Sequence, residues 1–215
     1  MSDADKQEVY TKSVDDGKRL IFGCGTGRCG TKSFQRLMSA QHGTYFTHEK
    51  LRLPWEADFT QCLGIVRKLL TRPEGALGDI AYWYLTYVSE LVTRYDAYIV
   101  ILRRDKQLTV ESILRQRYDY FSSEPAPEDI PPDWIGGTTP RFPGTRIEAV
   151  SAWWDMYYAS AGSLENLYPR RVKVVALDQL NSHIGQRELL RWLAYDNKHI
   201  RTAQLDPRYP MEDSP

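Results

Sequence analysis

A glycine-rich segment follows a short apolar run near the start of the chain and constrains the fold more than any other feature. It reads Ile-Phe-Gly-Cys-Gly-Thr-Gly-Arg-Cys-Gly-Thr-Lys-Ser-Phe over residues 21–34. This pattern predicts a buried strand, a tight turn and the first turn of a helix. Backbone N–H groups at a helix start lack intrahelical partners and attract anions, and glycines let the backbone approach a phosphate closely. The segment therefore predicts an anion-binding loop.

The phosphate loop of nucleoside triphosphatases, G-x-x-x-x-G-K-[ST], fits this segment only in part. Four residues separate Gly25 from Gly30, but Thr31 stands where the lysine belongs and Lys32 comes one residue later. That lysine must reach the β- and γ-phosphates, so the shift argues against the triphosphatase use. Arg28, in the middle of the loop, adds a cation at the same place.

Residues 28–32, Arg-Cys-Gly-Thr-Lys, resemble the 5′-phosphosulfate loop of the sulfotransferases, which typically reads [K/R]-S-G-T-[T/S] between a strand and a helix. Cys29 replaces the usual serine, and Lys32 replaces a usual small hydroxyl residue. Sulfotransferases use 3′-phosphoadenosine 5′-phosphosulfate (PAPS) as donor and release the bisphosphate PAP. The resemblance implies that the whole loop binds the donor: Gly25, Thr26, Gly27, Arg28, Cys29, Gly30, Thr31, Lys32 and Ser33.

A second segment strengthens the resemblance. The apolar run over 98–102 predicts a buried parallel strand that ends in two arginines, and Ser112 follows Arg104 by eight residues. The 3′-phosphate site of sulfotransferases is a strand ending in Arg with a Ser eight residues later, so the resemblance assigns Arg104 and Ser112 to it. An arginine offers phosphate oxygens a planar fork of donors. Segments 78–85 and 177–193 also look like features of small bacterial sulfotransferases, and the resemblance covers roughly residues 18–195.

Composition and charge narrow the class of protein. The length of 215 residues predicts a single domain, and 28 basic residues balance 28 acidic ones, which gives no support for a nucleic-acid binder. No apolar run approaches the ~20 residues of a membrane span. Cys24, Cys29 and Cys62 fit no zinc spacing, and a reducing cytoplasm is the expected location. No metal is expected.

Alternating strand and helix patterns predict an α/β fold, a three-layer, P-loop-like parallel sheet flanked by helices. Residues 1–17 are expected to be an N-terminal extension, 122–146 a loop or lid carrying Trp134, and 197–215 an irregular tail. Strands are expected over 19–23, 44–47, 76–80, 98–102 and 171–176. Helices are expected over 31–41, 59–70, 82–95, 107–121, 147–167 and 186–193. Ligands of such sheets lie at the carboxyl ends of the strands, where both phosphate-binding segments fall.

The resemblance implies direct in-line transfer of a sulfonate from PAPS to a hydroxyl or amine of a small-molecule acceptor. Arg28 and Lys32 are the cations placed to meet charge on the leaving oxygen. His48 and Glu49 follow the second strand, about where sulfotransferases keep their base. Asp79 is a further candidate that could orient the base, bind the acceptor or cap the next helix.

Other interpretations remain open. Residues 172–178 look like a magnesium-binding strand ending in Asp178, which would suit a P-loop kinase or triphosphatase. A non-catalytic nucleotide-binding module would also keep the loop. A dinucleotide-binding enzyme is a further alternative, because Gly25, Gly27 and Gly30 match the G-x-G-x-x-G pattern, although no acidic residue ends a clear second strand to bind the ribose. Cys29 could be a nucleophile with a lowered pKa. The aromatic residues over 153–158 are expected to be core, and some could line an acceptor pocket.

Overall fold

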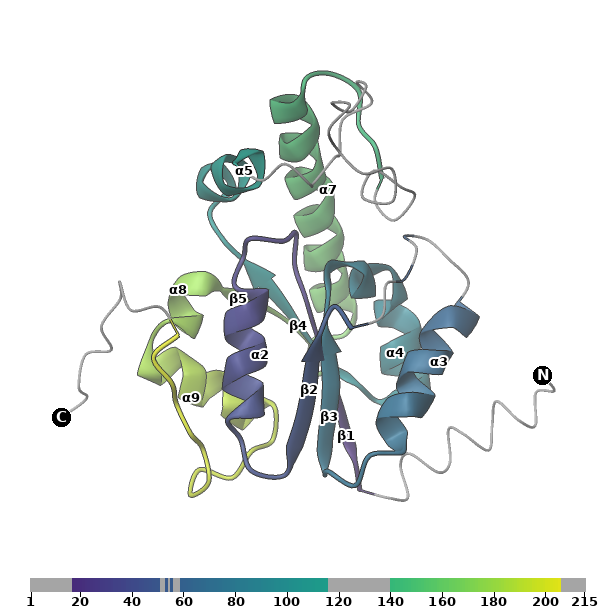
Figure 1. Cartoon of the computed structure of the whole chain (residues 1–215), viewed down its shortest axis with the longest axis vertical. Helices are drawn as coiled ribbons and strands as arrows, with labels where there is room; N and C mark the ends of the chain where they lie inside the picture. Colours follow the sequence, from purple (N-terminus) through teal and green to yellow (C-terminus); the bar gives the residue numbers. More distant parts are fainter. Residues whose placement is uncertain (1–16, 51–52, 54, 56–58, 116–139, 206–215) are drawn as a thin grey trace.

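The computed structural model describes residues 17–50, 53, 55, 59–115 and 140–205. Within these ranges the strands form one five-stranded sheet in the order β2-β3-β1-β4-β5 (Figure 1). Every pair of neighbours is parallel. The strands are β1 (Arg19–Cys24), β2 (Thr44–His48), β3 (Ala76–Ile80), β4 (Tyr98–Arg103) and β5 (Val172–Ala176). The predicted α/β class, with a parallel sheet flanked by helices, is confirmed.

The helices of the described residues largely follow the predicted positions. They are α2 (Thr31–Ser39), α3 (Phe59–Leu70), the 3-10 helix η1 (Tyr82–Tyr87), α4 (Val88–Tyr95), α5 (Lys106–Leu114), α7 (Arg146–Leu167), α8 (Leu177–Leu180) and α9 (His183–Trp192). The single helix predicted over 82–95 is instead a 3-10 turn followed by an α-helix, and α8 was not predicted. Residues 116–121 of the helix predicted over 107–121 lie outside the described residues.

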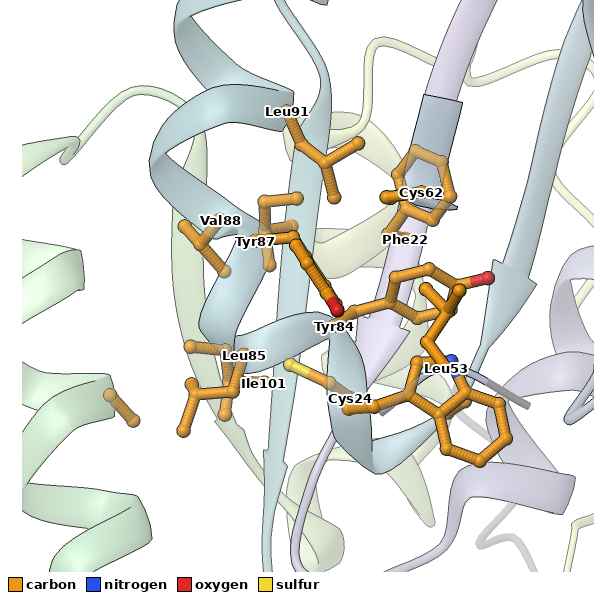
Figure 2. Close-up of a cluster of buried hydrophobic side chains, with 14 of the residues drawn as sticks. Phe22, Cys24, Leu53, Cys62, Tyr84, Leu85, Tyr87, Val88, Leu91 and Ile101 are labelled. Atoms are coloured by element: carbon orange, nitrogen blue, oxygen red, sulfur yellow. The ribbon is translucent and has the colours of Figure 1, made fainter. Parts of the chain in front are cut away.

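Helices cover both faces of the sheet, and successive side chains of β1 point alternately into the core on each face. Phe22 and Cys24 point into a larger core with α3, α4 and α7, whereas Ile21 points into a smaller core with α2 and α9. Figure 2 shows part of the larger core, in which the rings of Phe22 and Tyr84 lie 4.8 Å apart. Because helices cover both faces, β1 and β4 consist almost entirely of apolar residues.

The position of β1 in the sheet places the predicted anion-binding loop. β1 lies between β3 and β4, and its register pairs Gly23 with Ile80 and Cys24 with Ile101. The loop after β1 therefore lies beside the carboxyl ends of both neighbours. Figure 1 shows α5 and the upper part of α7 beyond this edge of the sheet.

Residues 197–205, the described part of the predicted tail, contain no helix or strand but are tied to the smaller core. The side-chain amide of Gln41 donates to Arg201 O (2.7 Å) and accepts from Arg201 N (3.0 Å). Gln186 makes the same pair of bonds with Ala203, at 2.8 and 2.9 Å. Each buried amide thus binds both backbone groups of one tail residue, as a neighbouring strand would.

Much of the predicted extension, loop and tail lies outside the described residues: 1–16, 122–139 with Trp134, and 206–215. Among the helices of the described part, none combines the length and apolar character needed to cross a membrane.

Candidate anion-binding and catalytic site

The loop after β1 has a backbone shape that requires glycine. Gly27, Arg28 and Gly30 all have positive φ angles, at 85°, 57° and 97°. A Cβ on Gly25 would lie 2.7 Å from the backbone oxygen of Leu102 and 2.4 Å from a cysteine sulfur of the same loop. The loop therefore closes tightly on β4, and a larger residue at position 25 would push the two apart.

The start of α2, like that of α4, lacks a side-chain cap, and unlike α4 it also lacks an acidic residue in its first turn. Gly30 occupies the capping position and provides no side-chain acceptor, and the first turn holds no acidic residue. In contrast, α5 begins at Asp105, whose carboxylate accepts from Leu108 N at 2.9 Å, and α7 and α9 are also capped by side chains. The N–H groups at the start of α2 have no such acceptor, and the exposed Lys32 lies in the same turn. This helix start therefore offers its N–H groups and a cation to an anion.

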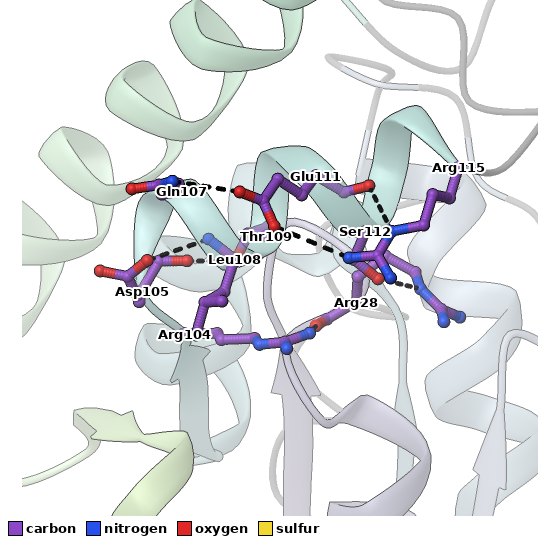
Figure 3. A network of polar contacts seen from close by, with 9 residues as sticks. All are labelled: Arg28, Arg104, Asp105, Gln107, Leu108, Thr109, Glu111, Ser112 and Arg115. Atoms are coloured by element: carbon purple, nitrogen blue, oxygen red, sulfur yellow. Dashed lines mark hydrogen bonds and ion pairs between the residues drawn. The ribbon is translucent and has the colours of Figure 1, made fainter.

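Three of the residues predicted to bind the donor, Arg28, Arg104 and Ser112, come together, as Figure 3 shows. Arg28 Nε donates to Ser112 Oγ at 3.1 Å, and Arg104 Nη1 donates to Arg28 O at 3.2 Å. Arg28 is thus in contact with both members of the Arg104–Ser112 pair. Hydrogen bonds therefore join the loop after β1 to the segment after β4.

His48, one of the candidate bases, lies beside the start of α2. His48 is the last residue of β2, and its Nε2 lies 3.0 Å from Thr31 Oγ1 in the first turn of α2. The His48 side chain is 16% exposed, and its Nδ1 lies 4.0 Å from Glu49 Oε2. Glu49 is more exposed, at 45%. The structure therefore joins His48 to the anion-binding loop, with Glu49 next to it.

Asp79 does not cap the next helix. It lies on β3, is 2% exposed, and accepts from Thr47 Oγ1 (2.5 Å) and from Tyr84 OH (2.8 Å). The helix that follows has Ala81 at its capping position and no side-chain cap. Burial and the charge of Asp79 raise the pKa of Tyr84 well above its usual value, so this hydroxyl remains a donor. Asp79 fixes Thr47, the residue before His48.

The hypothesis that Cys29 is a nucleophile with a lowered pKa is wrong. Cys29 is 0% exposed, and burial raises the pKa of its thiol to about 11. Cys24, also 0% exposed, has its pKa raised to about 12 by burial. Both thiols therefore stay protonated near neutral pH and pack as small apolar groups, Cys24 in the larger core and Cys29 in the smaller one.

Three aromatic residues of α7 contact the backbone of the site, which the sequence did not reveal. Trp153 Nε1 donates to Thr26 O at 3.1 Å, and Trp154 Nε1 donates to Arg104 O at 3.2 Å. Tyr158 OH donates to Leu102 O at 2.6 Å. Trp153 and Tyr158 are buried, so their expected place in the core is correct. The signal in the sequence was that each of these aromatic side chains carries one polar hydrogen that needs an acceptor when buried.

Asp178 does not end a strand, as the magnesium-binding interpretation required. It lies in the first turn of the short helix α8 and is exposed. The strand before it, β5, is the edge strand, and β4 separates it from β1.

A comparison with models of known protein families found no match, and no curated protein matches the chain. Its function must therefore be inferred from the residues and their geometry.

Proposed function

We propose that this chain is a PAPS-dependent sulfotransferase on a P-loop-like fold, which transfers a sulfonate to a hydroxyl or amine of a small molecule. One observation carries the proposal: two anion anchors lie at neighbouring strand ends and are bridged by Arg28. The first anchor is the uncapped start of α2, and the second is Arg104 with Ser112. PAPS carries a phosphosulfate at its 5′ position and a phosphate at its 3′ position, so it has one anionic group for each anchor.

The roles of the donor-binding residues follow from charge. The loop over 25–33 and Lys32 receive the 5′-phosphosulfate, and Arg104 with Ser112 receives the 3′-phosphate. Arg28 lies between the two and neutralises the bisphosphate product. As the sulfonate leaves, negative charge grows on the oxygen that linked it to the phosphate, and cations at the start of α2 stabilise that charge.

His48 is the base in this proposal. Histidine exchanges protons readily near neutral pH, and Thr31 ties its ring to the turn that holds the leaving group. Glu49 lies next to His48, with its Oε2 4.0 Å from His48 Nδ1. Asp79 fixes the backbone before His48 through Thr47.

Ligand-dependent stabilisation tests the donor. PAP, without magnesium, is expected to raise the melting temperature, and AMP, which lacks the 3′-phosphate, is expected to do so much less. Arg104→Ala should remove most of this preference for PAP, whereas Arg103→Ala, at the exposed neighbouring residue, should keep it. Stabilisation by ATP with magnesium alone would contradict the proposal and favour a P-loop kinase or triphosphatase.

Release of PAP from PAPS in the presence of candidate alcohols, phenols and amines tests catalysis. Arg28→Ala and His48→Ala are expected to lower turnover by roughly 100-fold or more while the fold remains intact. If the chain binds PAP but no acceptor supports turnover, it is a nucleotide-binding module instead.

A further inference from the structure

Helix α7 reaches both anion anchors with two consecutive side chains. Trp153 Nε1 donates to the carbonyl oxygen of Thr26, in the loop after β1 (3.1 Å). Trp154 Nε1 donates to the carbonyl oxygen of Arg104, in the segment after β4 (3.2 Å). Consecutive residues of an α-helix point about 100° apart, so one rigid helix can contact two different loops.

Tyr158, one turn further along α7, closes the same junction. Its hydroxyl donates to Leu102 O at 2.6 Å and lies 3.4 Å from Thr26 Oγ1. The oxygen of Leu102 is also the atom on which the loop closes at Gly25. The ring of Tyr158 packs 4.6 Å from that of Trp154, which links the two contacts.

Burial makes the hydrogen bonds of Trp153 and Tyr158 costly to lose, whereas Trp154 is half-buried. Trp153 is 0% exposed and Tyr158 is 8% exposed. A buried carbonyl that loses its donor keeps the full cost of its desolvation, so the loop is held in one position instead of several. α7 also holds α5, which carries Ser112, because Arg146 Nη1 donates to Leu114 O at its far end (3.2 Å).

We propose that Trp153 and Trp154 are positioning residues that fix the distance between the two anion anchors and so select ligands carrying two phosphates at one spacing. The inference rests on the proposed function, because that function supplies the two phosphates. A ligand that spans both anchors gains affinity only if their separation matches its own. A ligand with one phosphate occupies one anchor and does not sense that separation.

Two substitutions remove the indole donors, and two controls match them. Trp153→Phe and Trp154→Phe each remove one N–H from an anchor. Tyr157→Phe removes a similar donor from the same helix. Its hydroxyl binds Tyr82 O (2.9 Å) and contacts Cys24 at the end of β1, and neither residue belongs to an anchor. Trp192→Phe, on α9 against Tyr98, controls for the smaller ring.

The first measurement needs no ligand. Backbone amide exchange over residues 25–30 is expected to rise at least fivefold in Trp153→Phe, and exchange over 103–107 in Trp154→Phe, with neither control changing these segments. If both indole variants exchange like the parent at these segments, the positioning role is wrong, whatever the chain binds.

The second measurement is the affinity ratio. PAP is expected to bind Trp153→Phe and Trp154→Phe about tenfold more weakly, while 5′-AMP and 3′-AMP, with one phosphate each, change less than twofold. An equal loss for all three nucleotides would mean general damage and overturn the inference. If the parent protein does not bind PAP, the proposed function fails, and the exchange result still decides whether the indoles hold the loops.

Discussion

Helices α2 and α7 both begin after a glycine-containing turn, yet their first turns are built in opposite ways. Thr145 and Glu148 form a complete capping box at the start of α7. α2 begins at Thr31, after Gly30 at the capping position, with no side-chain cap, no acidic residue in its first turn and a lysine at its second residue. The carboxylate at the start of α7 offsets the helix dipole, whereas Lys32 adds to it.

The difference separates a helix start that stabilises the fold from one that is available to a ligand. The cap of α7 satisfies backbone donors within the chain at all times. At α2 the corresponding donors lie in a glycine loop with backbone angles that side chains disfavour, next to Arg28 and Lys32. A helix start that no side chain of its own caps gains the most from a bound anion.

Adding one methyl group at Gly25, in the loop before α2, should have the largest effect. Gly25→Ala would place a Cβ 2.7 Å from Leu102 O, so the loop must move away from β4. We expect PAP binding to be lost and the free energy of unfolding in urea to fall by roughly 3 kcal/mol. Gly64→Ala is the matched control: Gly64 lies in α3 with nothing within 4 Å of its Cβ position, and the change should stabilise the chain slightly. Normal PAP binding by Gly25→Ala would contradict a loop closed on β4.

A substitution that makes the start of α2 resemble that of α7 should have the next largest effect. It should keep or raise the stability of the free protein and lower its affinity for PAP. Lys32→Glu places an acidic residue in the first turn of α2. Without ligand the melting temperature should hold or rise, because a carboxylate there contributes about 0.5 kcal/mol. PAP affinity should fall roughly 100-fold, as the cation is replaced by an anion. The measurements are thermal unfolding and calorimetric titration, with Lys32→Ala as the neutral reference.

If Lys32→Glu lowered stability and left PAP affinity unchanged, the start of α2 would be a structural element like that of α7. The comparison between the two helices would then fail.

Removing the cap of α7 should have the smallest effect, and on stability alone. Thr145→Ala is expected to lower the free energy of unfolding by about 1 kcal/mol without changing PAP affinity. Hydrogen bonds from Thr145 hold the pKa of Glu148 below its ordinary value of 4.5. A carboxyl group whose pKa is lowered by folding stabilises the fold at pH values above its ordinary pKa. This stabilisation is lost as the pH falls through the pKa of the folded state.

The free energy of unfolding of the parent and of Glu148→Gln, measured as a function of pH, therefore tests whether the Glu148 charge contributes to stability. The parent should be the more stable at pH 7, and the two should converge below pH 4.5. A difference that persists at low pH would mean that the carboxylate charge is not its cause.

Local signals in the sequence predicted the parts of the site that are local in the chain. The strand, loop and start of α2 were predicted because glycines and a buried apolar run lie within a few residues of each other, and the predicted bounds of α3 and β3 were right. The hydrogen bonds of Trp153 and Trp154 to the loops could not be predicted, because they join residues 127 and 50 positions apart. Asp79 was left with three roles for the same reason, since its partner Thr47 lies 32 residues away.

The central place of β1 also determines when the site can exist. β1 is synthesised first, yet its neighbours β3 and β4 end at Ile80 and Arg103, and the indoles of α7 come later still. One edge of β1 therefore stays unpaired in an emerging chain until Ile80 has been made, and the other until Arg103, and such edges invite misassociation. Folding dominated by such distant pairings is slow. A ligand that needs both proposed anchors cannot stabilise early folding intermediates, because the anchors come together only when β1 and β4 are paired.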